Sequence, residues 1–170
     1  METVTHEFLP LFDKNSKILI LGTIPSPKSR EQGFYYGHPR NRFWKVLAQV
    51  FGEPVPETIE EKKFLALRNH VALWDVLASC SIHGAEDASI RDVVPNDMNV
   101  ILSQADIRAV FTTGTKATAL YRKYCEPVCR VPCIGLPSTS PANCRMKDEE
   151  LFREYQVIAE TACVISPKRV

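Results

Sequence analysis

The stretch that decides the fold is Lys17-Ile-Leu-Ile-Leu-Gly22. This continuous apolar run ends in glycine, which is typical of a β-strand covered on both faces. Three more stretches have a similar character, and they lie at 71–76, 108–113 and 130–136. Helical patterns separate the four strands, at 40–51, 57–69, 97–104, 115–124 and 148–161. Strands that alternate with helices predict an α/β fold, in which a four-stranded, mainly parallel sheet lies between helices.

The segments between these elements are expected to be irregular. Two prolines stiffen the turn over 22–29, and the polar residues of 84–96 indicate a loop. Pro132 cannot donate a backbone hydrogen bond, so the strand over 130–136 is predicted to lie at an edge of the sheet. We expect the tail after Ser166 to be loose.

Length and charge limit the class of protein. A chain of 170 residues predicts one domain, covering 1–170. Its 21 basic and 20 acidic residues exclude an evenly basic nucleic-acid coat and an acidic tail. No apolar run approaches the ~18 residues that cross a bilayer, and the N-terminus lacks the pattern of a secretion signal. We therefore expect a cytoplasmic monomer without a membrane partner.

The six cysteines do not predict a metal site or disulfides. Cys125, Cys129 and Cys133 are evenly spaced, but they form no C-x-x-C pair and have no histidine nearby. Pro127 and Pro132 are expected to break a helix through this segment. A chain of this length has its own core and needs no disulfides, so these three residues are interpreted as buried or half-buried thiols.

Ligands of parallel sheets bind beyond the carboxyl ends of the strands. Three segments occupy such positions: Gly22-Thr-Ile-Pro-Ser-Pro-Lys-Ser29, Thr112-Thr-Gly-Thr115 and Leu136-Pro-Ser-Thr-Ser-Pro-Ala-Asn-Cys-Arg145. The first lacks the glycines of a dinucleotide or phosphate loop, and its prolines suit a rigid pocket wall. Hydroxyls in the last segment could bind phosphate oxygens. Each of the three could equally be an ordinary turn or a capped loop.

A fourth segment, Gly33-Phe-Tyr-Tyr-Gly-His-Pro-Arg-Asn-Arg-Phe-Trp44, combines aromatic rings with basic residues. Aromatic rings stack on bases, and arginines attract phosphate. Residues 26 to 45 contain five basic residues and one acidic residue, a local excess of four that predicts a basic face for DNA. These residues could instead have purely structural roles: core packing for Phe43 and Trp44, a turn cap for His38 and a helix cap for Asn41. At the end of a strand, Asp75 could reach the pocket or cap a turn.

The order of these motifs resembles the uracil-DNA glycosylase superfamily. The likeness rests on a strand followed by Gly-Thr-Ile-Pro-Ser, then on His38-Pro-Arg-Asn-Arg-Phe-Trp44, and finally on Leu136-Pro-Ser-Thr-Ser-Pro-Ala-Asn143. It spans nearly the whole chain and is nearest to the hypoxanthine-DNA glycosylase branch, with similarity to the mismatch-specific uracil and thymine glycosylases. The resemblance implies a three-layer α/β/α sandwich that removes deaminated bases from DNA.

The resemblance also assigns roles to residues. In the mismatch-specific relatives an asparagine after the first Gly-x positions the attacking water, but this chain has Ile24 there, so Asn41 becomes the catalytic candidate. Base binding is expected from Thr23, Ile24, Tyr36 and His38, with Tyr36 stacking on the base. DNA binding is expected from Ser26, Arg40, Ser138, Ser140, Asn143 and Arg145, with Arg145 filling the gap that the extruded base leaves. Asn41 could orient the water or grip the base.

The implied activity is that of a monofunctional DNA glycosylase. Water would cleave the N-glycosidic bond and leave an abasic site, with hypoxanthine the first substrate and uracil the second. No metal and no cofactor is required. Two rival functions are a nucleoside or nucleotide hydrolase, which would cleave free deoxyinosine, and a non-catalytic nucleic-acid-binding module, which Asn41→Ala would not affect. A cysteine hydrolase that combines Cys133 or Cys144 with His38 lacks a recognisable nucleophile motif.

Overall fold

A four-stranded parallel sheet forms the centre of the computed structural model, which describes residues 1–6 and 8–165. The strands are β2 (Ile18–Gly22), β3 (Val71–Asp75), β6 (Ala109–Thr113) and β7 (Cys133–Leu136), in the order β3-β2-β6-β7. All three neighbouring pairs are parallel, and the register sets Gly22 beside Asp75. The predicted number of strands and their direction are confirmed, and β7 with its preceding Pro132 lies at the edge.

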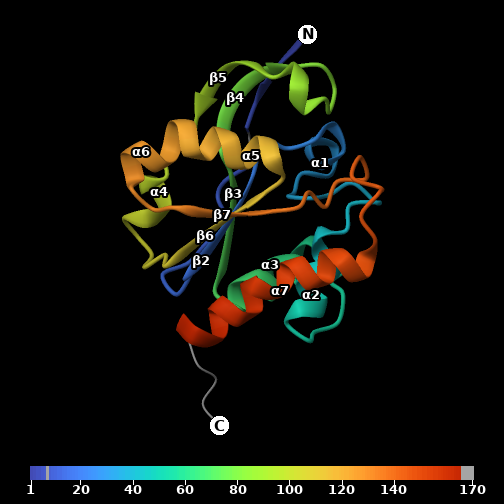
Figure 1. The fold of residues 1–170 in the computed structure, drawn as a ribbon, viewed down its shortest axis with the longest axis vertical. Coiled ribbons are helices and arrows are strands. Elements are labelled where there is room, and N and C mark those ends of the chain that lie inside the picture. The colour runs from blue at the N-terminus through green and yellow to red at the C-terminus, as the bar shows by residue number, and fades with distance from the viewer. Residues whose placement is uncertain (7, 166–170) are drawn as a thin grey trace.

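Helices cover both faces of this sheet, as the three-layer expectation requires (Figure 1). On one side lie α2 (Phe43–Val50), α3 (Ile59–Arg68) and α7 (Asp148–Ile165). On the other side lie α5 (Thr115–Leu120), the π-helical turn η2 (Tyr121–Cys125) and α6 (Glu126–Cys129). Ile18 to Leu21 of β2 are at most 1% exposed, because the strand is covered from both sides. This burial explains why its sequence is apolar at every position.

A second sheet was not predicted from the sequence. The strands β1 (Glu2–Thr5), β4 (Leu77–Ile82) and β5 (Arg91–Pro95) pair antiparallel in the order β1-β4-β5. The loop expected over 84–96 therefore contains β5 and the short 3-10 helix η1 (Asp87–Ser89). β5 has no buried residue, so its polar sequence does not distinguish it from a loop. β4 follows β3 after the single residue Val76 and joins the two sheets.

Three smaller expectations were also wrong. The proline-rich turn over 22–29 runs into a short helix α1 (Pro27–Gln32), which Ser26 caps and Gly33 ends at a φ of 75°. The helix that begins at Thr115 does not stop at 124, because Pro127 lies in the first turn of α6, where no backbone donor is needed. The predicted helix over 97–104 is shorter, at α4 (Asn99–Leu102).

The described residues include no helix that is both long and apolar enough to cross a bilayer. All six cysteines have free thiols, and Cys125, Cys129 and Cys133 are buried or half-buried as expected. The residues after 165, where a loose tail was expected, lie outside the described part of the chain.

Candidate active site

The main cavity opens at the carboxyl ends of β2 and β6, with a volume of about 1620 Å³. This is the point where the strand order reverses: β3 lies on one side of β2, and β6 lies on the other side. Ligands of open α/β sheets bind at such a switch point. The three segments that follow β2, β6 and β7 all contribute to the lining, together with the segment that contains Tyr36 and Asn41.

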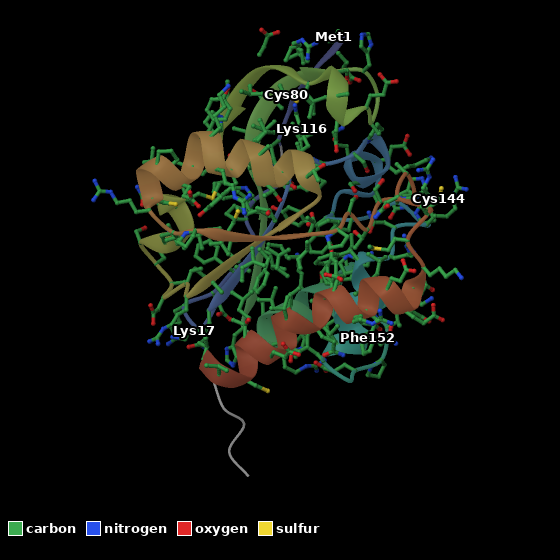
Figure 2. All side chains as sticks on the ribbon, viewed as in Figure 1. Met1, Lys17, Cys80, Lys116, Cys144 and Phe152 are labelled. Atoms are coloured by element: carbon green, nitrogen blue, oxygen red, sulfur yellow. The ribbon has the colours of Figure 1, made fainter. Side chains whose placement is uncertain are left out.

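Nine of the eleven residues that the sequence assigned to the site line this cavity. They are Thr23, Ile24, Ser26, Tyr36, His38, Asn41, Ser138, Ser140 and Asn143. Arg40 and Arg145 are exposed and lie outside the lining. Arg145 directly follows the exposed Cys144, whose position on the loop after β7 is visible in Figure 2. Of the residues considered for a cysteine hydrolase, only His38 lines the cavity, which leaves that function without a nucleophile there.

Tyr36 is fixed at the cavity wall by three constraints. Its ring stacks on Phe43 with a centroid distance of 3.8 Å and an interplanar angle of 16°. Its hydroxyl lies 3.2 Å from Thr113 Oγ1, and its backbone has a φ of 53°, a strained left-handed conformation for a side chain of this size. Burial raises the pKa of the Tyr36 hydroxyl, and the Asp75 charge adds to the rise, so the phenol stays protonated. Because Phe43 covers one face, only the opposite ring face can receive a base.

Asn41 both caps a helix and faces the cavity. Its Oδ1 accepts the backbone N–H of Phe43 at 2.9 Å, which directs the carbonyl oxygen toward the first turn of α2. The amide nitrogen Nδ2 is then the freer end of the side chain, and it has no hydrogen-bond acceptor among the described residues. The two interpretations left open by the sequence are therefore compatible, because capping uses the oxygen and leaves the two N–H donors for a ligand.

His38 and Ser26 are engaged in local hydrogen bonds. His38 Nδ1 accepts the backbone N–H of Arg40 at 3.0 Å, so the ring of a neutral His38 carries its proton on Nε2. Ser26 Oγ accepts the N–H of Ser29 at 3.2 Å, and the two hydroxyl groups lie 3.1 Å apart. Ser26 therefore caps α1, and His38 keeps one donor for a ligand.

The loop after β7 presents two serine hydroxyls. Ser138 Oγ accepts the N–H of Ser140 at 3.1 Å, and Ser140 Oγ accepts the N–H of Ala142 at 3.2 Å. Because each oxygen receives a backbone donor, each hydroxyl proton is left to donate outward, which suits a phosphate oxygen. Asn143 instead donates its amide to the carbonyl of Ser138 at 2.9 Å and holds the loop in shape.

Two side chains from neighbouring helices anchor this loop. Arg42 Nη2 donates to the carbonyl of Asn143 at 2.8 Å, and its Nη1 donates to the carbonyl of Met146 at 2.5 Å. Tyr155 of α7 donates its hydroxyl to the carbonyl of Pro137 at 2.5 Å. These bonds fix the loop relative to Asn41, which directly precedes Arg42 in the chain.

The basic excess predicted over residues 26–45 is reduced in the folded chain by two acidic residues from outside the segment, Glu2 and Asp148. Lys28 pairs with Glu31 within the segment, but the other acidic partners come from distant positions: Arg30 with Glu2, and both Arg42 and Lys45 with Asp148. Of the five basic residues, only Arg40 has no acidic partner in the described ranges. Arg122, which the sequence analysis missed, adds a further guanidinium to the cavity lining.

Asp75 lines the cavity and forms a buried pair with His6, which lies behind it and is not part of the lining. Their Nε2 and Oδ2 atoms are 2.7 Å apart, and the two side chains are 2% and 6% exposed. β1 pairs with β4 and brings His6 to this position, where its backbone N–H donates to Ala78. The sequence placed Asp75 at the end of a strand as a possible pocket residue, but no local signal pointed to His6.

The backbone of Gly22 leaves room for the Asp75 carboxylate. A Cβ atom on Gly22 would lie 2.5 Å from Asp75 Oδ1, 3.4 Å from Tyr36 Oη and 3.7 Å from Thr113 Oγ1. Three polar atoms thus gather above one glycine at the switch point, and all four residues line the cavity. We call these residues, Gly22, Tyr36, Asp75 and Thr113, the pocket floor.

An open parallel sheet with an aromatic, amide-bearing pocket at its switch point defines a class of protein whose site is suited to planar, hydrogen-bonding ligands. The family model of the uracil DNA glycosylase superfamily matches residues 9–158. A curated hypoxanthine DNA glycosylase of Methanosarcina acetivorans is 35% identical over 147 residues, 84% of this chain and 90% of the relative. Its counterpart in Methanosarcina barkeri is 36% identical over 112 residues, 65% and 71% of the two chains.

The structural comparison agrees with the sequence comparison. The solution structure of a candidate uracil DNA glycosylase from Methanosarcina acetivorans superposes with a TM-score of 0.80 at 29% identity, covering 94% of this chain and 98% of that one. The chain therefore belongs to the uracil DNA glycosylase superfamily, and it is a DNA glycosylase. The fold and family expected from the sequence motifs are confirmed.

Proposed function

We propose that this DNA glycosylase excises hypoxanthine from DNA, and uracil as a second substrate, by hydrolysis of the N-glycosidic bond. The main support for this proposal is that Tyr36 and Asn41, from one short segment, line a single cavity together with the serines of the loop after β7. The names of the two curated relatives support hypoxanthine as the first substrate.

The target base must leave the duplex before it can enter this cavity. The free face of Tyr36 offers a stacking surface, which is worth about 1–3 kcal/mol per base. Ser138 and Ser140 are suited to hold the flanking phosphates with their outward hydroxyl protons. Arg145, exposed on the same loop, is our candidate for the side chain that fills the vacated position in the duplex.

Asn41 is the proposed catalytic residue. Cleavage of the glycosidic bond leaves negative charge on the departing base, and a donor directed at that charge lowers the barrier. The Asn41 oxygen accepts the N–H of Phe43 and the residue lines the cavity, so its N–H donors are the atoms left for a ligand, which supports gripping the base over activating the water. A base that spreads its charge over carbonyl oxygens leaves with little help from an acid, so an amide donor suffices.

The attacking nucleophile in this proposal is water, and the product is an abasic site. A lysine nucleophile would require an uncharged amine near the sugar. The ammonium groups of Lys28 and Lys45 are each engaged by a carboxylate, Glu31 at 3.1 Å and Asp148 at 2.6 Å. The enzyme is therefore proposed to be monofunctional, without strand cleavage of its own.

The decisive experiment uses a labelled duplex with a single deoxyinosine or deoxyuridine, incubated with the protein in chelator and then treated with alkali. Strand scission after alkali, and none before it, is expected for deoxyinosine first and deoxyuridine second. Tyr36→Ala should lower the excision rate about 10- to 100-fold, as loss of one stacking surface predicts. Failure to release any deaminated base from DNA, with cleavage of free deoxyinosine, would favour the nucleoside hydrolase instead.

A further inference from the structure

We propose that Thr113, the last residue of β6, is a positioning residue that directs the Tyr36 ring for base stacking by accepting the proton of its phenol. This role rests on the proposed function, because the Tyr36 ring is the surface that would receive the extruded base. Thr113 lines the cavity and is buried, so its hydroxyl acts on neighbouring groups of the protein rather than on bulk solvent.

The main chain around Tyr36 is held on both sides of the residue. The carbonyl of the preceding residue accepts the indole N–H of Trp44 at 3.0 Å, and the N–H of the following residue donates to Ser29 Oγ at 3.0 Å. Between them, the backbone of Tyr36 keeps its left-handed φ of 53°. The far end of the ring is held separately: Oη lies 3.2 Å from Thr113 Oγ1 and has no other hydrogen-bond partner among the described residues.

The direction of the hydrogen bond follows from the second contact of Thr113. Its Oγ1 lies 3.4 Å from the backbone carbonyl oxygen of Leu21 on β2, which can only accept. The proton of Thr113 therefore points to β2, and a lone pair of Oγ1 is left for Tyr36. Burial first and the Asp75 charge second raise the pKa of the Tyr36 phenol, which keeps its proton and donates it to Thr113.

A second acceptor borders the Tyr36 hydroxyl. A Cβ atom on Gly22 would lie 3.4 Å from Tyr36 Oη and 2.5 Å from Asp75 Oδ1, so the two oxygens adjoin the same small space. Asp75 Oδ1 makes no hydrogen bond within the described ranges. A phenol deprived of Thr113 would turn to this oxygen, because a buried donor without an acceptor is costly, and the ring would then leave its place against Phe43.

The expected order of variants follows from this geometry. Thr113→Val keeps the shape of the side chain and removes the acceptor, so the preference for a base over an abasic site should fall about 5- to 50-fold, since the stacking ring is misplaced rather than absent. Tyr36→Phe removes the phenol and leaves no donor unpaired, so the preference should stay within about 3-fold of the wild type. The double variant should match Tyr36→Phe, and therefore bind the base better than Thr113→Val alone.

The test compares two single-stranded oligonucleotides, so that base pairing does not contribute. One carries a non-cleavable 2′-fluoroarabino analogue of deoxyinosine, and the other carries a tetrahydrofuran abasic analogue. The ratio of the two Kd values isolates the base, because contacts to the DNA backbone are common to both. Thr113→Ser keeps the hydroxyl and should restore the wild-type ratio.

Thr112→Val is the matched control. Thr112 is the preceding residue of the same strand, is buried, and lies outside the cavity lining. Its hydroxyl lies 2.7 Å from that of Thr118, so the substitution also breaks a buried hydroxyl pair. This variant should lose stability and keep the wild-type ratio of Kd values, which separates positioning of Tyr36 from a general loosening of the fold.

A folded Thr113→Val with the wild-type ratio overturns the inference, even when deoxyinosine is excised and the proposed function stands. A double variant no better than Thr113→Val also overturns it, since the effect would not pass through the phenol, and so does a wild type that binds both oligonucleotides equally. A loss in Thr113→Val that Tyr36→Phe reverses supports it, even when no base is excised and the proposed function fails.

A measurement on the wild type covers a Thr113→Val protein that does not fold. The NMR spectrum should contain a Tyr36 hydroxyl proton that is protected from exchange and shows a nuclear Overhauser effect to the Thr113 methyl group, both in the free protein and with the inosine analogue bound. Rapid exchange of this proton with water in the bound protein would overturn the inference.

Discussion

Substitutions of Asn41 separate its two functions, because capping uses the oxygen and ligand binding uses the nitrogen. Asn41→Ala removes the 2.9 Å hydrogen bond to the N–H of Phe43. Loss of such a cap costs about 1 kcal/mol, and in a chain of this size each kcal/mol lowers the melting temperature by about 2–4 °C. Loss of a donor at the developing charge lowers kcat by about 10²- to 10³-fold. Asn41→Ala should show both losses.

Asn41→Asp keeps the capping oxygen and removes only the N–H donors. Its melting temperature should match that of the wild type, while its excision of deoxyinosine should fall as far as that of Asn41→Ala. Asn41→Ser repeats the test with a neutral cap. Thr58→Ala is the matched control, because Thr58 Oγ1 caps α3 through the N–H of Glu61 at 3.1 Å and does not line the cavity.

Melting curves and single-turnover excision on one duplex, measured well below the melting temperature, provide the readout. Thr58→Ala should lose the same stability as Asn41→Ala and keep its excision rate. An Asn41→Asp protein that excises deoxyinosine at the wild-type rate would refute the role of the amide donors, and would leave Asn41 as a helix cap alone.

Two further predictions concern the floor and the loop. Gly22→Ala should destabilise the fold by about 1–3 kcal/mol, seen in urea unfolding, because its Cβ would lie 2.5 Å from Asp75 Oδ1, on a carboxylate whose other oxygen is held by His6; unchanged stability would mean that the carboxylate moves freely. Hydrogen bonds from Lys45 first and Arg42 second lower the pKa of Asp148 in the folded protein. The ionised carboxylate therefore stabilises the fold at a pH above its pKa in the unfolded chain. This stabilisation is lost as the pH falls through the lower pKa of the folded state. Asp148→Asn should therefore be less stable than wild type at pH 7 and equally stable at strongly acidic pH, and a gap in urea midpoints that persists there would contradict the ion pairs.

The parts of the fold that the sequence predicted are those with local signals. β2 is covered on both faces, so every residue from Ile18 to Leu21 is apolar and the strand is evident. β5 is half-exposed and polar, and β1 is four residues long, so their formation depends on pairing with β4 rather than on their own composition. Such pairing joins residues far apart in the chain, and the hydrophobic periodicity of a single segment does not predict it.

The same limit applied to the site. The motifs identified Tyr36 and Asn41, because both belong to one short segment with an unusual composition. The charge of that segment was only partly predictable, since Glu2 and Asp148 pair with its basic residues from distant positions in the chain. His6 directly follows β1 and reaches Asp75 because β1 pairs with β4, so no pattern of neighbouring residues could have placed it there.

The position of β1 affects how this enzyme should be produced for study. A shortened version that starts at residue 9, where the family match begins, would still contain the whole central sheet and every motif residue. It would lack the imidazole that contacts Asp75 Oδ2 and the strand that pairs with β4. Purification tags are therefore better joined to the C-terminus, so that β1 and its pairing with β4 are left undisturbed.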